Sequence, residues 1–288
     1  MYPAKVDYYR ATTVAEAVKL LQKNRGARLL AGGHSLLPMM KLRTASPTVL
    51  VDIGRIKNLS GIKVGKKEVK IGALTTHTMI ATSEELKVAC PILPETAMQV
   101  ADQQVRNRGT IGGSLANADP AADYPTVMLA LEATFTAVGP KGERQIPAGK
   151  FFKDLFTTAL KRDEILTTIT VPAYGGMAGM GGAYLKHRHP ASSFAVVGVA
   201  VMMGVEEGKI ARINVVVGGT TATPVHAASV EAALMGMEPT EENIATAAEK
   251  MNIEATIGDA YASPEYRAHL AKVMAKRALM LAAQRAMK

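Results

Sequence analysis

Ala31-Gly32-Gly33-His34-Ser35 and Thr110-Ile111-Gly112-Gly113-Ser114 are the two stretches that decide what kind of fold this chain adopts. Each contains a pair of adjacent glycines, which lack a Cβ and therefore allow the backbone to come close to a ligand. The N–H groups of such a turn can converge on an anion, and the neighbouring Ser and Thr hydroxyls can donate to its oxygens. Two such segments in one chain predict two loops that grip one pyrophosphate.

Neither glycine segment matches the common nucleotide-binding signatures. The Gly-x-Gly-x-x-Gly spacing of the Rossmann fold and the Gly-Lys-Ser/Thr ending of the P-loop are both missing. The His-Glu-x-x-His and Gly-x-Ser-x-Gly motifs are also absent, which removes the usual zinc-hydrolase and serine-hydrolase interpretations. A tight turn is the alternative interpretation for Ala31–Ser35 taken alone, and the presence of a second, similar segment favours phosphate binding.

Composition and charge narrow the class of protein further. The 288 residues are 48% hydrophobic, which fits a folded protein of two domains. The net charge of +9 is spread along the chain without a dense basic run containing aromatics, so nucleic-acid binding is not predicted. The single cysteine, Cys90, can make no intrachain disulfide, iron–sulfur cluster or zinc site alone. Neither a secretory signal nor a membrane-spanning run is visible, and we expect a cytoplasmic protein.

Hydrophobic periodicity predicts an α/β unit at the start of the chain and α+β texture after it. A capping box at Thr13–Glu16 opens a helix, and a linker with five glycines is expected at 172–182. The other expected helices cover 37–42, 76–83, 91–99, 225–234, 241–251 and 264–287, and the expected strands 29–31, 49–53, 62–64, 69–73, 134–138, 165–171, 183–187, 194–205 and 210–218.

Both glycine segments, read with their flanks, closely resemble the FAD-binding subunits of molybdenum hydroxylases, the xanthine dehydrogenase family. The matching stretches run from Ala31 to Arg43 and from Arg108 to Asp123, and the resemblance extends from Val6–Arg10 to Tyr266–Leu270. Within the family, the resemblance is strongest to medium subunits of the aerobic carbon monoxide dehydrogenase type.

The resemblance implies a fold of the α+β class. An FAD-binding domain of the vanillyl-alcohol-oxidase type is expected over residues 1–175, built from two α/β subdomains at about 1–57 and 58–175. The C-terminal domain, 176–288, is expected to combine a three-stranded antiparallel sheet with a helical bundle.

The same resemblance implies a set of FAD-binding residues. The first glycine segment, continued to Leu36, and the second would bind the pyrophosphate, with Asp123 at the adenosine end. A solvated loop carboxylate is the alternative for Asp123, and His34 either touches phosphate or shapes its turn. Phe194 is expected near the isoalloxazine ring or else in the core. The full set is Ala31, Gly32, Gly33, His34, Ser35, Leu36, Thr110, Ile111, Gly112, Gly113, Ser114, Asp123, Ile165, Leu166, Lys186 and Phe194.

The resemblance also implies the role of the chain in a larger assembly. FAD would be bound non-covalently. A small subunit would carry two [2Fe-2S] clusters and a large subunit the molybdopterin cofactor, in a dimer of heterotrimers. Electrons would pass from molybdenum through the clusters to FAD, and then to a quinone or another acceptor, with peripheral association at the inner face of the cytoplasmic membrane. No catalytic residue and no metal site are expected on this chain itself.

The chain departs from the family pattern at three positions, and three alternative functions remain to be distinguished. Arg10-Ala11 stands where the family often has Arg-Pro, His226 where Arg is common, and Ser193 where Asp often precedes the aromatic residue. The complex could instead hydroxylate a purine, a nicotine-like or another aromatic substrate. A nucleotide-binding scaffold without redox activity and a single-chain flavin oxidase are alternatives from other classes.

Overall fold

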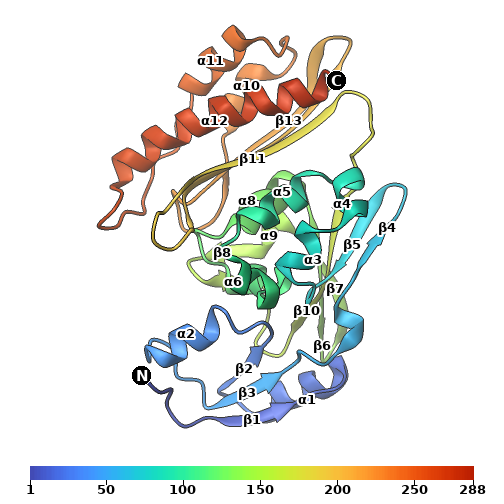
Figure 1. Cartoon of the computed structure of the whole chain (residues 1–288), viewed down its shortest axis with the longest axis vertical. Helices are drawn as coiled ribbons and strands as arrows, with labels where there is room; N and C mark the ends of the chain where they lie inside the picture. The colour runs from blue at the N-terminus through green and yellow to red at the C-terminus, as the bar shows by residue number, and fades with distance from the viewer.

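The computed structural model describes residues 1–288 as three layers, each built around its own sheet (Figure 1). The N-terminal layer lies at one end of the long axis and the C-terminal layer at the other. No helix combines the length and the hydropathy that crossing a bilayer would need.

The N-terminal layer is a three-stranded parallel sheet in the order β1-β3-β2. The Thr13 hydroxyl caps the first helix by accepting a hydrogen bond from the Glu16 N–H at 3.1 Å. Ala17, Val18 and Leu21 form the buried face of this helix, as the 3.6-residue period predicts. The elements are β1 (Asp7–Arg10), α1 (Val14–Lys23), β2 (Ala27–Leu30), α2 (Leu36–Lys41) and β3 (Val49–Asp52).

The middle layer is a five-stranded antiparallel sheet in the order β4-β5-β10-β6-β7, packed against helices. Its central strand, β10, is the last of the five in sequence, so the sheet is completed only when the chain returns at residue 165. The elements are the 3-10 helix η1 (Lys57–Leu59), β4 (Ile62–Val64), β5 (Glu68–Gly72), α3 (His77–Ala81), α4 (Glu84–Ala89), α5 (Ile92–Gln99), α6 (Gln103–Arg108), α7 (Ile111–Asn117), α8 (Asp123–Ala130), β6 (Thr134–Gly139), β7 (Gly142–Pro147), α9 (Ala148–Phe151), β8 (Phe152–Asp154), β9 (Thr157–Thr158) and β10 (Ile165–Pro172).

The C-terminal layer is an antiparallel sheet in the order β11-β12-β13-β14, crossed by one long helix (Figure 1). This helix approaches the sheet closely, because a Cβ added at Gly181 would lie 2.1 Å from the Ala282 carbonyl oxygen. The elements are β11 (Met180–Arg188), β12 (Ala195–Glu206), β13 (Lys209–Gly218), β14 (Val225–His226), α10 (Ala228–Leu234), α11 (Glu241–Glu249) and α12 (Pro264–Ala286).

The α+β class is confirmed, but two details of the C-terminal layer are corrected. The sheet has four strands, not three, and the helix expected from residue 225 begins at Ala228. Val225 and His226 instead pair with Val217 and Val216 at the edge of β13. The unpaired edge of β13 supplies the hydrogen-bond partners of these two residues, a long-range pairing that local periodicity does not reveal.

The expected glycine-rich linker is shorter than the sequence suggests. Of the 172–182 stretch, Pro172 ends β10 and residues from Met180 onward belong to β11. The division of the chain at about residue 175 stays a prediction.

Candidate functional site: a cavity between two glycine loops

The first glycine segment packs against the backbone that leads directly into the second. The first follows β2 and the second forms the start of α7. A Cβ added at Gly32 would lie 2.1 Å from the Arg108 carbonyl oxygen and 2.9 Å from Gly109 Cα. Gly33 has a φ of 78°, a left-handed conformation that favours glycine. The glycines therefore bring together two segments that are far apart in the sequence.

The backbone amides of the two loops differ in what they bind. In the second loop, Ile111 N donates to Thr75 O, Gly112 N to Ala73 O and Gly113 N to the Thr110 hydroxyl. In the first loop, the N–H groups of Gly32, Gly33, His34 and Ser35 donate to no acceptor in the protein. The first loop thus offers four consecutive free donors, which is the arrangement that an anion needs.

Both loops line one cavity of about 740 Å³, a volume within the usual range of small-molecule sites. The remaining walls come from β10, from the β8–β9 hairpin and from the segment before β12. Of the residues expected at the FAD site, all line this cavity except Ile111 and Lys186. Ile111 is fully buried behind its loop, and the Lys186 side chain is 2% exposed.

His34 is placed to shape its turn. Its ring Nδ1 lies 2.9 Å from the Gly32 carbonyl oxygen, in hydrogen-bond contact, and the residue is exposed at the cavity. Phe194 lines the cavity with 44% of its surface exposed, so it is not a core aromatic.

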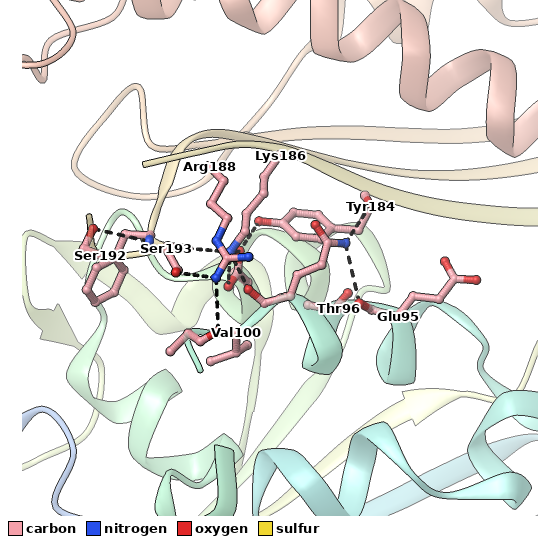
Figure 2. Close-up of polar contacts among 12 residues, drawn as sticks. Glu95, Thr96, Val100, Tyr184, Lys186, Arg188, Ser192 and Ser193 are labelled. Atoms are coloured by element: carbon pink, nitrogen blue, oxygen red, sulfur yellow. Dashed lines mark hydrogen bonds and ion pairs between the residues drawn. The ribbon is translucent and has the colours of Figure 1, made fainter. Parts of the chain in front are cut away.

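Asp123 belongs to a buried polar cluster at the edge of the cavity, together with Tyr184 and Lys186, whose side chains are labelled in Figure 2. Its carboxylate accepts a hydrogen bond of 2.6 Å from the Tyr184 hydroxyl and one of 2.9 Å from Lys186 Nζ. Burial raises the pKa of Asp123 and lowers the pKa of Lys186, so each charge depends on the other to stay ionised. The solvated-loop alternative for Asp123 is wrong, because the residue is only 5% exposed.

His77 is a cavity residue that the sequence analysis missed. Its imidazole is buried beneath the second loop, where a Cβ added at Gly109 would lie 2.7 Å from Nε2. Burial lowers the pKa of His77 to about 4, and Nδ1 has no hydrogen-bond partner. The only signal in the sequence is Thr76, which caps α3 directly before it. That pattern predicts a helix start and says nothing about a cavity.

The site holds donors and apolar walls but no assembled nucleophile or metal centre. No group of three or more His, Cys, Asp or Glu side chains in the chain is arranged to hold a metal ion. Burial raises the pKa of the Cys90 thiol well above its usual value, which keeps it unreactive. The free amides and the loop hydroxyls fit a phosphate-bearing ligand, and Ile165, Leu166 and Phe194 supply an apolar wall for a ring system. These features fit FAD.

Comparison with known proteins gives two family matches that together span most of the chain. Residues 4–174 match the FAD binding domain in molybdopterin dehydrogenase, and residues 182–282 match the CO dehydrogenase flavoprotein C-terminal domain. The carbon monoxide dehydrogenase medium chain of Hydrogenophaga pseudoflava is 38% identical over 97% of this chain and 97% of its own length. The glyceraldehyde dehydrogenase medium chain of Sulfolobus acidocaldarius is 36% identical, over 96% of this chain and 98% of its own.

The structural comparison agrees with the sequence comparison. A solved structure of carbon monoxide dehydrogenase from Hydrogenophaga pseudoflava, which lacks the Mo-pyranopterin moiety of the molybdenum cofactor, matches with a TM-score of 0.93 and 39% identity. The match covers 99% of this chain and 99% of the other.

Proposed function

Because this chain belongs to the family of FAD-binding subunits of molybdopterin dehydrogenases, we propose that it is the flavoprotein subunit of an aerobic carbon monoxide dehydrogenase. In that role the chain accepts electrons from the [2Fe-2S] clusters of a small partner subunit and delivers them to an acceptor. Substrate oxidation takes place on a large molybdopterin subunit, and the three chains assemble as a dimer of heterotrimers.

The observation that carries the FAD assignment is the row of free amides at Gly32–Ser35 inside the cavity. These N–H groups would bind the pyrophosphate, with the hydroxyls of Ser35 and Ser114 beside them. Gly112 and Gly113 keep the second loop close enough to complete the cradle, while Ile111 supports it from the core. Asp123 would lie at the adenosine end, and Ile165, Leu166 and Phe194 against the isoalloxazine ring.

Bound FAD supplies redox chemistry in which electrons are taken up one or two at a time. The protein's part is to bind and orient the cofactor and to adjust its electrostatic surroundings. The site contains no acid–base pair suited to a substrate, which fits an electron-transfer subunit better than a single-chain flavin oxidase. The free amides likewise favour a nucleotide ligand over a pure scaffold role.

The acceptor we propose is a quinone, reached at the inner face of the cytoplasmic membrane. The net charge of +9 supports this, because a basic protein is attracted to anionic lipid. Membrane association that is unaffected by added salt would contradict this part of the proposal.

A second candidate function is the same flavoprotein role in a complex that oxidises another substrate. The similarity to a glyceraldehyde dehydrogenase medium chain, nearly equal to that of the carbon monoxide enzyme, favours keeping this candidate. Purine, nicotine-like and aromatic substrates belong to the same candidate. Substrate choice resides in the large subunit, so the co-purifying chains and the reducing substrate distinguish the two.

FAD binding by the full-length chain tests the proposal directly. The chain is mixed with excess FAD, passed through a desalting column, and its absorbance is recorded. We expect about one FAD per chain, and release of free FAD on denaturation because the link is non-covalent. A chain that retains no flavin under these conditions contradicts the proposed function.

A further inference from the structure

Lys186 and Arg188 are alternate residues on β11, so their side chains leave the same face of the strand (Figure 2). Each of them bridges the same two segments of the cavity wall. Lys186 Nζ donates to Ser193 O at 2.8 Å and to Gln99 O at 2.9 Å. Arg188 Nη2 donates to the Ser193 hydroxyl and to Ala101 O at 3.3 Å. We name this pair of side chains the β11 clasp.

Both segments that the clasp joins contain a non-glycine residue in a left-handed conformation. Ser193 has a φ of 64° and Ala101 a φ of 42°. Such residues cost free energy and persist only where their surroundings hold them. Residues 100, 101 and 192–194 all line the cavity, so the clasp holds the strained part of its wall.

The hydrogens of the Lys186 ammonium are fully used within the protein. An ammonium group has three donors, and here they go to Gln99 O, Ser193 O and the Asp123 carboxylate. The group is almost completely buried and is absent from the cavity lining. Lys186 therefore has no donor left for a ligand, although the family resemblance implies a flavin contact.

The clasp region also carries more positive than negative charge. Arg106 Nη1 donates to Val100 O at 2.9 Å and to Ala101 O at 3.1 Å, which adds a third cation to the same segment. Among these contacts the single carboxylate partner is Asp123, which pairs with Lys186 at 2.9 Å. Asp102, directly after Ala101, accepts from Val105 N instead, so the three cations outnumber the two carboxylates. Positive charge beside a cavity favours a ligand that becomes more negative.

We propose that Lys186 and Arg188 are positioning residues for the flavin, acting through Gln99–Ala101 and Ser192–Phe194 rather than by touching it. The proposal rests on the FAD-binding function above. It has two consequences for the bound cofactor. The clasp fixes the wall against which the flavin lies, and its charge raises the midpoint potential of the flavin.

Arg188 gives the cleaner test, because it is exposed and its removal leaves the buried Lys186–Asp123 pair intact. The full-length chain is compared with Arg188→Met and Arg188→Lys, and with Arg212→Met as the matched control. Arg212 is an exposed arginine on β13 of the same sheet with no hydrogen bond to the cavity wall. Three quantities are measured: the FAD Kd by flavin fluorescence, the midpoint potential of bound FAD by dye equilibration, and the melting midpoint.

For Arg188→Met we expect the FAD Kd to rise about tenfold, since two charge-assisted hydrogen bonds to the wall are lost. The midpoint potential should fall, and the melting midpoint should stay near that of Arg212→Met. Arg188→Lys should keep the midpoint potential of bound FAD, because the positive charge remains. It should still weaken FAD binding, because an ammonium group lacks the planar guanidinium geometry that makes both hydrogen bonds.

The outcomes separate the inference from the proposed function. Failure of the unmodified chain to bind FAD would contradict the proposed function itself. Normal FAD binding by the unmodified chain, with an Arg188→Met variant that matches Arg212→Met in both Kd and potential, would overturn this inference alone. A lowered melting midpoint with unchanged Kd and potential would also overturn it, because the role would then be structural.

Discussion

Gly32 shows at the scale of one residue why the glycine pairs are needed. Its position is fixed by the Arg108 carbonyl oxygen, which lies 2.1 Å from the place that a Cβ would occupy. The neighbour is backbone, so it cannot rotate away as a side chain would. A methyl group added at residue 32 would therefore push the two loops apart.

We predict that Gly32→Ala lowers stability by about 2 kcal/mol and weakens FAD binding at least tenfold, because overpacking forces the loops apart. Thermal unfolding and FAD titration measure the two effects. Gly149→Ala is the matched control, since its Cβ would meet only Leu129 Cδ1 at 3.9 Å. Equal behaviour of the two variants would mean that the close approach of the loops is unimportant.

His226 gives a pH-dependent prediction. Its Nδ1 lies 2.8 Å from Glu231, whose hydrogen bond raises the pKa of His226 above its usual value. A raised folded-state pKa adds stability that is complete below the unfolded value of about 6.5 and is lost as the pH rises through the folded value. Since His226 is exposed and its ion pair is screened by solvent, we expect a small effect of this sign.

The variant His226→Arg should remove that pH dependence, because arginine keeps its charge. We predict that the melting midpoint of the unmodified chain falls relative to His226→Arg as the pH rises above about 6.5. His269→Arg, at an exposed histidine of α12 without a carboxylate partner, is the control. A constant difference between His226→Arg and the unmodified chain across this range would refute the ion pair.

The sequence was most informative about residues whose chemistry is local. The glycine pairs lack a Cβ, and this alone predicts that the backbone comes close to another group. The helix caps at Thr13 and Ser263 can each be recognised from a pattern of four consecutive residues. His77 and the partners of Lys186 could not be found in this way. Except for Ser193, which is seven residues from Lys186, their contacts come from segments more than 30 residues away, such as Gly109 against His77 and Gln99 against Lys186.

At the scale of elements, the buried Arg267 helps to attach α12 to its sheet, in addition to the apolar face of the helix and to the Arg285 hydrogen bond with Gly182 O. Arg267 Nη1 donates to Val196 O at 2.6 Å and to Gly219 O at 2.8 Å, while Nη2 donates to Asp259 at 2.7 Å. The two carbonyls lie at the start of β12 and just after β13. One side chain therefore ties the helix to both strand ends next to the cavity wall.

We predict that Arg267→Leu destabilises the chain by about 3 kcal/mol, because two buried carbonyls lose their charged donor. Urea unfolding measures the change. Arg277→Leu, on an exposed position of the same helix, should leave stability within about 0.5 kcal/mol. Similar losses in the two variants would show that the helix is held by its apolar face alone.

Long elements with a strong period were predictable from the sequence, and pairings were not. The span of α12 differs by one residue from that expected, since its Ser-Pro start and apolar spacing are local features. The strand β14 was missed because its two residues form a strand only through the open edge of β13. The central position of β10 in its sheet could not be predicted either, because it results from pairing with two distant strands, β5 and β6.

At the scale of the molecule, the cavity joins parts of the chain that fold around different sheets. Its walls combine the loop after β2, the loop before α7, strand β10 and the segment before β12. The C-terminal layer is therefore part of the cavity wall, which it reaches through residues 192–194, and the β11 clasp holds this segment.

The most direct test of the central claim is the visible absorption spectrum of the native protein, purified with its partner chains and exposed to carbon monoxide without oxygen. We predict flavin bands over a broad iron–sulfur background, and loss of both when carbon monoxide is added. If the flavin and iron–sulfur bands stay intact with carbon monoxide but are bleached by another substrate, the second candidate function is the correct one. A colourless protein that also fails to bind added FAD would contradict the account.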